Sequence, residues 1–206
     1  MRGLSLTFGA LIAGLFLANP TTRAEDAKVP DSKYYPLSVG TEWKYVIKTP
    51  NGDKEITSKI VKVEMFEGVM CALQETSVDG TAAGREHLRG DEKGMKRYSY
   101  NGVALKPPVE FIKLPVKKGD KWSGDSEVGG QKVSFSFEIT ATDEKVKVPA
   151  GEYEAVAVKT TFSAGGAPAQ QNITLYYAPG VGQVKTVITV NGTTIPVELK
   201  EFKKGK

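Results

Sequence analysis

Short runs of alternating apolar and polar residues dominate this sequence from about residue 40 onward. In residues 132–141, Val133, Phe135, Phe137 and Ile139 occupy alternate positions, with serine, glutamate and threonine side chains between them. Successive side chains of a strand point to opposite faces of a sheet, so this pattern predicts a half-buried antiparallel strand. Similar alternation occurs in residues 42–48, 152–162 and 172–177. No apolar stripe with a helical period extends beyond two turns, so the predicted fold class is all-β.

Turn-forming dipeptides separate these runs. Asn-Gly and Asp-Gly favour tight hairpin turns because both residues tolerate positive φ, and Pro-Gly suits the centre of a type II turn. The candidate turns are Asn51-Gly52, Asp79-Gly80, Asn101-Gly102, Gly129-Gly130, Pro149 with Gly151, Pro179-Gly180 and Asn191-Gly192. Their spacing predicts an antiparallel meander of about eleven strands, curled into an open or half barrel.

A motif that contains tryptophan occurs twice. "PLSVGTEW" at 36–43 and "PVKKGDKW" at 115–122 share Pro, an aliphatic residue, Gly and Trp at the same positions, and they contain both tryptophans of the chain. The repeat predicts two duplicated halves, at about 34–108 and 109–206, within one β domain spanning 34–206. Two interpretations of the motif remain open. Trp43 and Trp122 either cap the core after a structural entry turn, or line a shared apolar cavity that binds a ligand.

The N-terminal stretch predicts export. Arg2 precedes an uncharged apolar run at 3–18, and "TRA" at 22–24 supplies small residues before Glu25. These features predict a signal peptide at 1–24, followed by a flexible leader at 25–33, and a periplasmic or secreted protein. The alternative is an uncleaved anchor, but the run is shorter than the roughly 20 apolar residues that span a bilayer. We therefore expect no stable membrane span after cleavage.

Charge and residue usage exclude several kinds of chemistry. The 28 Lys and Arg residues nearly balance the 24 Asp and Glu residues, and arginine is scarce after the leader, so a nucleic-acid partner is not expected. Cys71 and His87 are each the only residue of their type, which leaves no predicted metal site. No motif for a catalytic serine, a phosphate-binding loop or a cofactor is present, so we predict neither an enzyme nor a cofactor.

One polar cluster, at 84–98, is a candidate anion site. On a strand, Arg85, His87 and Arg89 share one face, while Glu86 and Leu88 share the other. Three cationic or potentially cationic side chains on one face suit a carboxylate or phosphate group. The alternative is a solvated outer face, partly neutralised by nearby acidic residues.

Three segments together resemble a family of exported bacterial β-proteins that carry a domain of unknown function. They are "YYPLSVGTEWKY" (34–45), "VPAGEYEAVAVK" (148–159) and "YYAPGVGQVK" (176–185), which contain PLxxGxxWxY, PAG-aromatic and YAPGVGxVK elements. The resemblance covers most of the chain after the leader. It implies a curved antiparallel sheet, similar at fold level to the half barrels of exported lipoprotein carriers, which hold acyl chains in a concave face.

Together these observations predict a noncatalytic exported module that binds an apolar or amphiphilic ligand, such as a lipid, in a concave β-sheet. The candidate ligand-binding residues are Arg85, His87, Arg89, Trp43 and Trp122. The alternative is a structural or protein-interaction accessory of the cell envelope, whose partner would be an envelope protein and not a small molecule.

Overall fold

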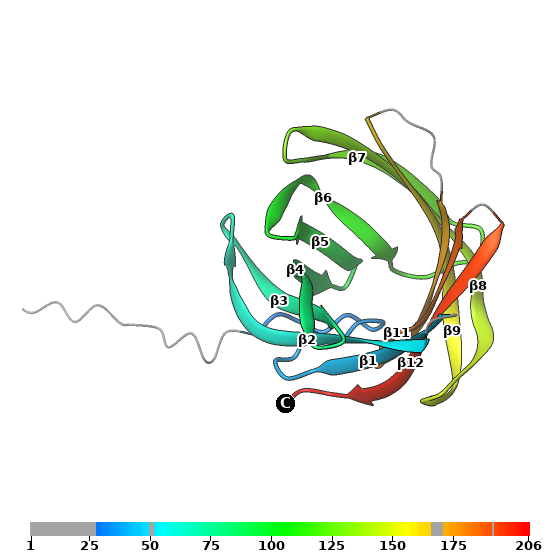
Figure 1. The fold of residues 1–206 in the computed structure, drawn as a ribbon. Helices are drawn as coiled ribbons and strands as arrows, with labels where there is room; N and C mark the ends of the chain where they lie inside the picture. Colours follow the sequence, from blue (N-terminus) through cyan, green and yellow to red (C-terminus); the bar gives the residue numbers. More distant parts are fainter. Residues whose placement is uncertain (1–27, 50–51, 166–170, 191) are drawn as a thin grey trace, which may run out of the picture.

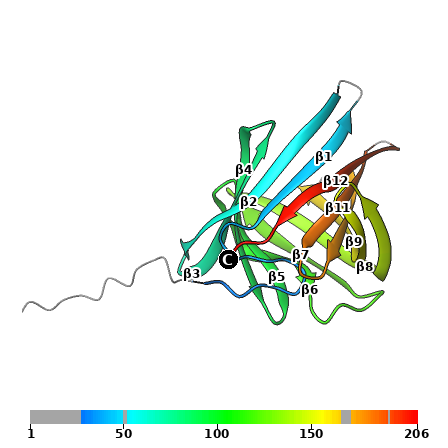
Figure 2. The same ribbon diagram turned by 90° about the horizontal axis from the view of Figure 1, so that it is seen from below.

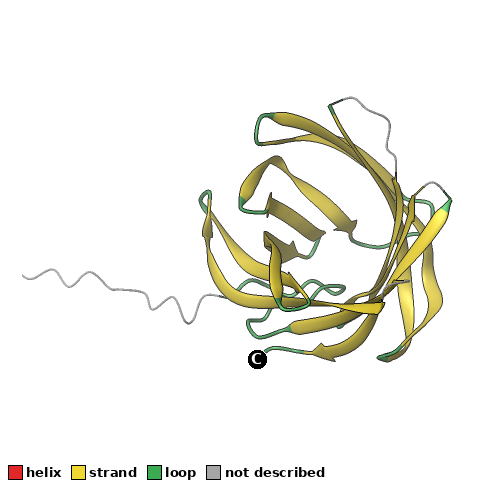
Figure 3. Cartoon of the chain, viewed as in Figure 1, coloured by secondary structure: helices red, strands yellow, loops and turns green. Residues whose placement is uncertain are grey.

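The computed structural model describes residues 28–49, 52–165, 171–190 and 192–206, which form twelve strands and no helix (Figure 3). The predicted signal peptide at 1–24, Asn51 and Asn191 lie outside these residues. Within the described part, no helix is long and apolar enough to span a membrane. The strands are β1 Glu42–Thr49, β2 Gly52–Phe66, β3 Val69–Val78, β4 Thr81–Asp91, β5 Gly94–Tyr100, β6 Val103–Lys113, β7 Lys121–Val128, β8 Gln131–Val148, β9 Gly151–Ala164, β10 Gln171–Ala178, β11 Gly182–Val190 and β12 Thr193–Lys203.

Each strand pairs antiparallel with the next along the chain, and β1 pairs with β12, so the sheet closes into a barrel (Figure 1). The predicted all-β antiparallel meander is confirmed. Pairing of the first strand with the last closes the curled sheet, and these two strands lie side by side along one flank (Figure 2).

The ladder between β6 and β7 is the shortest of the barrel. Only Leu105 and Lys106 pair with β7, because Pro107 and Pro108 follow and have no N–H to donate. Beyond this point, side chains replace the ladder. Ser126 Oγ donates to the Pro107 carbonyl at 2.8 Å, and Trp122 Nε1 donates to the Glu110 carbonyl at 2.7 Å. We call this stretch the β6–β7 seam.

Alternate turns of the meander lie at opposite ends of the barrel. One end, which we call the mouth, carries the turns at 79–80, 101–102 and 129–130. In the first two, Asp79 and Asn101 have φ values of 49° and 50°, and each precedes a glycine at 78°, so these hairpin turns are confirmed. The other end, the base, carries the turns at 67–68, 92–93, 114–120, 149–150 and 179–181.

Residues 28–41 cover the base before the chain enters β1. Gly180 N–H donates to the Lys33 carbonyl at 2.9 Å, and the Asp31 carboxylate accepts the Leu37 N–H at 2.6 Å. Val29, Tyr34 and Leu37 are buried against the barrel. Part of the stretch that we expected to be a flexible leader, residues 28–33, therefore packs on the domain and helps to close one end of it.

The two tryptophan motifs adopt the same local structure. Gly40 N–H donates to the Ile60 carbonyl at 2.8 Å, and Gly119 N–H donates to the Ile139 carbonyl at 2.8 Å. Trp43 pairs with Ser58, and Trp122 pairs with Phe137. The pairing partners, Ser58 and Phe137, are as far apart in the sequence as the two tryptophans. The bulges that follow Ile60 and Ile139 are separated by the same interval. Matching registers support two duplicated halves, although the duplication itself stays a prediction.

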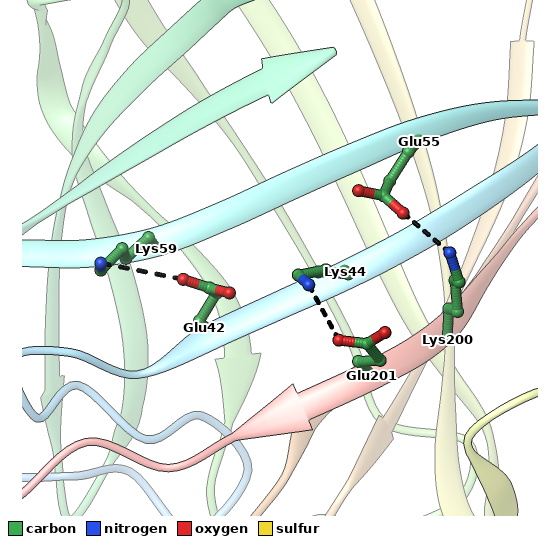
Figure 4. A network of polar contacts seen from close by, with 6 residues as sticks. All are labelled: Glu42, Lys44, Glu55, Lys59, Lys200 and Glu201. Carbon is green, nitrogen blue, oxygen red and sulfur yellow. Dashed lines mark hydrogen bonds and ion pairs between the residues drawn. The ribbon is translucent and has the colours of Figure 1, made fainter. Parts of the chain in front are cut away.

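Cross-strand ion pairs line the outer face where the barrel closes (Figure 4). They are Lys44–Glu201 at 2.9 Å, Lys200–Glu55 at 2.9 Å and Lys59–Glu42 at 3.8 Å. The hydrogen bond from Lys44 lowers the pKa of Glu201. Because these side chains are solvated, the pairs favour the observed register more than they stabilise the fold.

Candidate functional site

The barrel encloses a cavity of about 310 Å³ above the base. Its lining side chains come from strands all around the barrel and include Ser58, Gln74, Glu86, Arg97, Thr160 and Leu175. It is therefore an interior space with an amphipathic wall, and its volume lies at the lower end of the range for small-molecule sites.

Aromatic rings form the floor of this cavity. Tyr35 belongs to the segment 28–41 that covers the base. Its ring centroid lies 5.0 Å from that of Trp43, 6.2 Å from that of Phe111 and 6.5 Å from that of Tyr177. Its hydroxyl donates to Gln74 Oε1 at 2.7 Å, and the Tyr45 hydroxyl donates to the Gln183 carbonyl. Burial raises the pKa of Tyr35, and it does the same for Tyr45 and Tyr177. These phenols therefore stay neutral at physiological pH.

An ion pair between Glu86 and Arg97 lies above this floor. Arg97 Nε is 3.2 Å from Glu86 Oε2, and the guanidinium lies 5.3 Å from the Phe111 ring centroid and 5.9 Å from that of Tyr100. The side chains are largely buried, at 16% exposed for Glu86 and 30% for Arg97. Buried polar atoms usually have hydrogen-bond partners. Arg97 Nε contacts the Glu86 carboxylate as an ion pair without forming a hydrogen bond, and the Thr160 hydroxyl has no hydrogen-bond partner. The cavity wall thus presents an ion pair and a hydroxyl without a hydrogen-bond partner.

A second cavity, of about 380 Å³, adjoins the first on the side of the mouth. The two share Arg97, Val109 and Phe162, and the rest of the second is almost entirely apolar. Tyr100 and Phe162 on its rim are 50% and 37% exposed. Apolar side chains therefore line the space between the mouth and the interior ion pair, which we call the apolar passage.

The predicted anion cluster lies on the outside of the barrel. Leu88 pairs with Arg97, and both line the interior with Glu86, so Arg85, His87 and Arg89 point outward. Arg85 is exposed and lies near the turn at Gly102, whereas Arg89 donates to the Met70 carbonyl at 2.9 Å. These three residues share a strand face, as we predicted, but none of them lines the interior cavity.

His87 makes contacts that resemble those of a catalytic triad. Its Nδ1 lies 2.7 Å from Ser99 Oγ, and its Nε2 lies 3.1 Å from Glu64 Oε1. However, Ser99 is fully buried, its Oγ also accepts the His87 backbone N–H, and Phe66 stacks on the imidazole with centroids 4.1 Å apart. A substrate cannot reach this hydroxyl, so the cluster clamps β2, β4 and β5 together. No group of three potential ligands that could hold a metal occurs among the described residues.

The two tryptophans occupy different places. Trp43 is completely buried, packs beneath Tyr35 and donates its indole N–H to the Val181 carbonyl at 2.7 Å. Trp122 is half-buried, stacks on Phe137 at 5.2 Å and lines a separate, open depression. Each ring packs at the entry to its strand, as the structural interpretation of the motif requires. The structure does not bring the five predicted residues together at one site.

The sequence analysis did not predict the interior ion pair of Glu86 and Arg97, although the sequence contains a signal for part of it. Glu86 lies on the same strand face as Leu88, and an apolar neighbour on that face favours an inward orientation. Arg97 could not be assigned to the same site, because only the pairing of β4 with β5 places it beside Leu88.

Cys71 provides a check on the packing of the outer face. Burial raises the pKa of its thiol to about 11, so only about 10⁻⁴ of the molecules carry a thiolate at pH 7. We expect a disulfide reagent to label the folded protein at least about 100-fold more slowly than free cysteine, and unfolding in denaturant to restore full labelling. Cys71→Ser is the blank. Complete labelling of the native protein within minutes at pH 7 would contradict this packing.

Comparisons with known proteins reveal a shared fold. No protein-family model matches this chain, and no curated protein does. Among solved structures, an exported protein with a YmcC-like fold from Bacteroides fragilis matches with a TM-score of 0.57 and 15% identity, over 84% of this chain and all of that one. A protein described as a lipoprotein, from Parabacteroides distasonis, matches with a TM-score of 0.50 and 14% identity over the same shares. At this identity the likeness establishes the fold alone, and the sequence motifs of the exported family stay a prediction.

Proposed function

We propose that this protein is an exported, noncatalytic module that binds an amphiphilic ligand with an acyl tail inside its barrel. The observation that carries the proposal is the amphipathic interior cavity, which shares lining residues with the adjoining apolar passage on the side of the mouth. Such a space offers burial to a tail and hydrogen bonds to a head, which together characterise sites for small amphiphiles.

Two further observations support an extracytoplasmic binding role. The solved structures that share the fold are described as an exported protein and a lipoprotein, and the N-terminal residues 1–24 have the pattern of a signal peptide. The serine of the triad-like cluster is inaccessible, which favours binding over hydrolysis. On this proposal the protein holds or carries a ligand in the periplasm or outside the cell.

A ligand-loading experiment tests the proposal. The protein is stripped of bound lipid under denaturing conditions, refolded and titrated with 1-monopalmitoylglycerol while its thermal unfolding is monitored. At a ligand concentration of about 100 times Kd, we expect the melting temperature to rise by roughly 5–10 °C. The organic extract of untreated protein should also contain an acyl lipid by mass spectrometry. Absence of both the shift and an extracted lipid would overturn the proposal.

A second candidate is a protein-interaction accessory of the cell envelope, which the β6–β7 seam favours. Along the seam, β6 and β7 pair with β5 and β8 but not with each other beyond Lys106. Strand edges without ladder partners can accept a strand from another protein. A pull-down from an envelope fraction, competed by saturating acyl ligand, separates this candidate from the first. If saturating ligand does not reduce the capture of an envelope protein, the result favours a protein-interaction role for the β6–β7 seam.

A further inference from the structure

We propose that the bound amphiphile carries an uncharged head with hydroxyl or amide groups, which binds the Glu86–Arg97 pair while the tail extends toward the mouth. This inference rests on the proposed function and adds the class of ligand and its orientation.

The orientation follows from the order of polar and apolar surfaces along the barrel. The base is closed by residues 28–41 and the aromatic floor, so a ligand can enter only from the mouth or through the wall. The mouth cavity is lined by apolar side chains such as Leu105, Val128 and Phe135, whereas the inner cavity holds Glu86. Burial of an apolar tail is most favourable in the mouth cavity, whereas a polar head is placed most favourably in the inner cavity, where it can form hydrogen bonds. The head therefore lies deep in the barrel, above the floor.

The charge of the head follows from the charge of the wall. Among the described residues that line the inner cavity, Glu86 and Arg97 are the charged ones, and their charges cancel. A free carboxylate or ammonium would add an unbalanced charge to a largely desolvated space, and an anion would also lie close to the Glu86 carboxylate. Neutral phenols on the floor supply no compensating charge. An uncharged head avoids this penalty.

The hydrogen-bonding character of the head follows from the polar groups of the inner wall. Arg97 Nε contacts the Glu86 carboxylate at 3.2 Å without a hydrogen bond, and the buried Thr160 hydroxyl has no hydrogen-bond partner. A guanidinium can only donate, a carboxylate can only accept, and a hydroxyl does both. A diol or a primary amide offers an acceptor to Arg97 and a donor to Glu86, so it can hydrogen-bond to both members of the pair. A purely apolar ligand would add no hydrogen bond to the pair and would leave the Thr160 hydroxyl without a partner.

Matched ligands and a charge-changing variant test the inference. Calorimetric titrations compare 1-monopalmitoylglycerol with palmitate, which has the same tail, at pH 7.4 and at concentrations where both are monomeric. The wild-type protein should bind the neutral ligand at least about tenfold more tightly. In Glu86→Gln, which preserves the shape of the side chain, Arg97 loses its counter-charge. Palmitate affinity should then rise at least about tenfold, while affinity for the neutral ligand changes less.

Glu198→Gln is the matched control, because Glu198 pairs with Lys185 at 2.8 Å on the outer face of the barrel. It should leave both affinities unchanged. A wild-type preference for palmitate, or no gain in palmitate affinity in Glu86→Gln, would overturn the inference and leave the proposed function standing. If neither ligand binds the wild-type protein, the proposed function fails and the inference fails with it.

Discussion

Replacing Trp43 by alanine should lower the free energy of unfolding by about 3–5 kcal/mol. The indole is fully buried, contacts Tyr35 and Phe202, and donates its N–H to the Val181 carbonyl. Its removal leaves a cavity under the aromatic floor and an unpaired carbonyl at the base. For a domain of this size, the melting temperature should fall by roughly 10 °C or more, which thermal unfolding followed by circular dichroism measures.

Trp122→Ala is the matched comparison, because Trp122 holds the same place in the second motif. Its ring is only half-buried, although it makes an equivalent hydrogen bond, to the Glu110 carbonyl across the β6–β7 seam. We expect a smaller loss, of about 2 kcal/mol, since less apolar surface is exposed by the truncation. Equal losses at the two positions would contradict the assignment of Trp43 to the closed base and Trp122 to the wall.

Replacing Val109 by tryptophan should reduce affinity for an acyl ligand by at least about 100-fold. Val109 lines both the inner and the mouth cavity, so a bulky ring there fills the junction through which the tail must pass. Because empty space adjoins the side chain, we expect overpacking to cost no more than about 1–3 kcal/mol. Calorimetric titration with 1-monopalmitoylglycerol measures the loss of binding, and thermal unfolding measures the cost in stability.

Val187→Trp introduces the same ring on the outside of the barrel, because the neighbouring Thr186 and Ile188 point inward. This variant should bind ligand as the wild-type protein does. If Val109→Trp unfolds, Phe162→Asp at the partly exposed rim offers a second way to weaken binding of the tail, because it places a carboxylate in the apolar passage. Undiminished affinity in a folded variant of either position would show that the ligand binds elsewhere.

Local features of the sequence predict much of this fold. The alternation in residues 132–141 becomes the N-terminal part of β8, with Phe137 and Ile139 buried, and the turns at Asp79-Gly80 and Asn101-Gly102 have the positive φ values that their residues favour. These features depend on steric preferences of neighbouring residues, so a linear pattern contains them. The common interval of the two tryptophan motifs likewise appears again in the registers of β1–β2 and β7–β8.

The candidate site depends on contacts between distant residues, which the linear pattern does not contain. The alternation in β4 separates Arg85, His87 and Arg89 from Glu86 and Leu88 correctly, but it does not say which set faces the interior. That choice depends on the closure of the barrel through β1 and β12. The aromatic floor of the cavity also depends on contacts between distant residues. Tyr35 packs there against Phe111 and Tyr177 only when residues 28–41 fold across the base.

The most direct test of binding inside the barrel is to map where a bound tail lies. A monoacylglycerol with a photoreactive diazirine near the end of its tail is bound and irradiated, and the labelled peptides are identified by mass spectrometry. We expect labels on mouth-cavity residues such as Val128, Val133 and Phe135, and we expect these labels to be lost in Val109→Trp but not in Val187→Trp. Labels confined to outward-facing residues, or equal labelling in the two variants, would contradict binding inside the barrel.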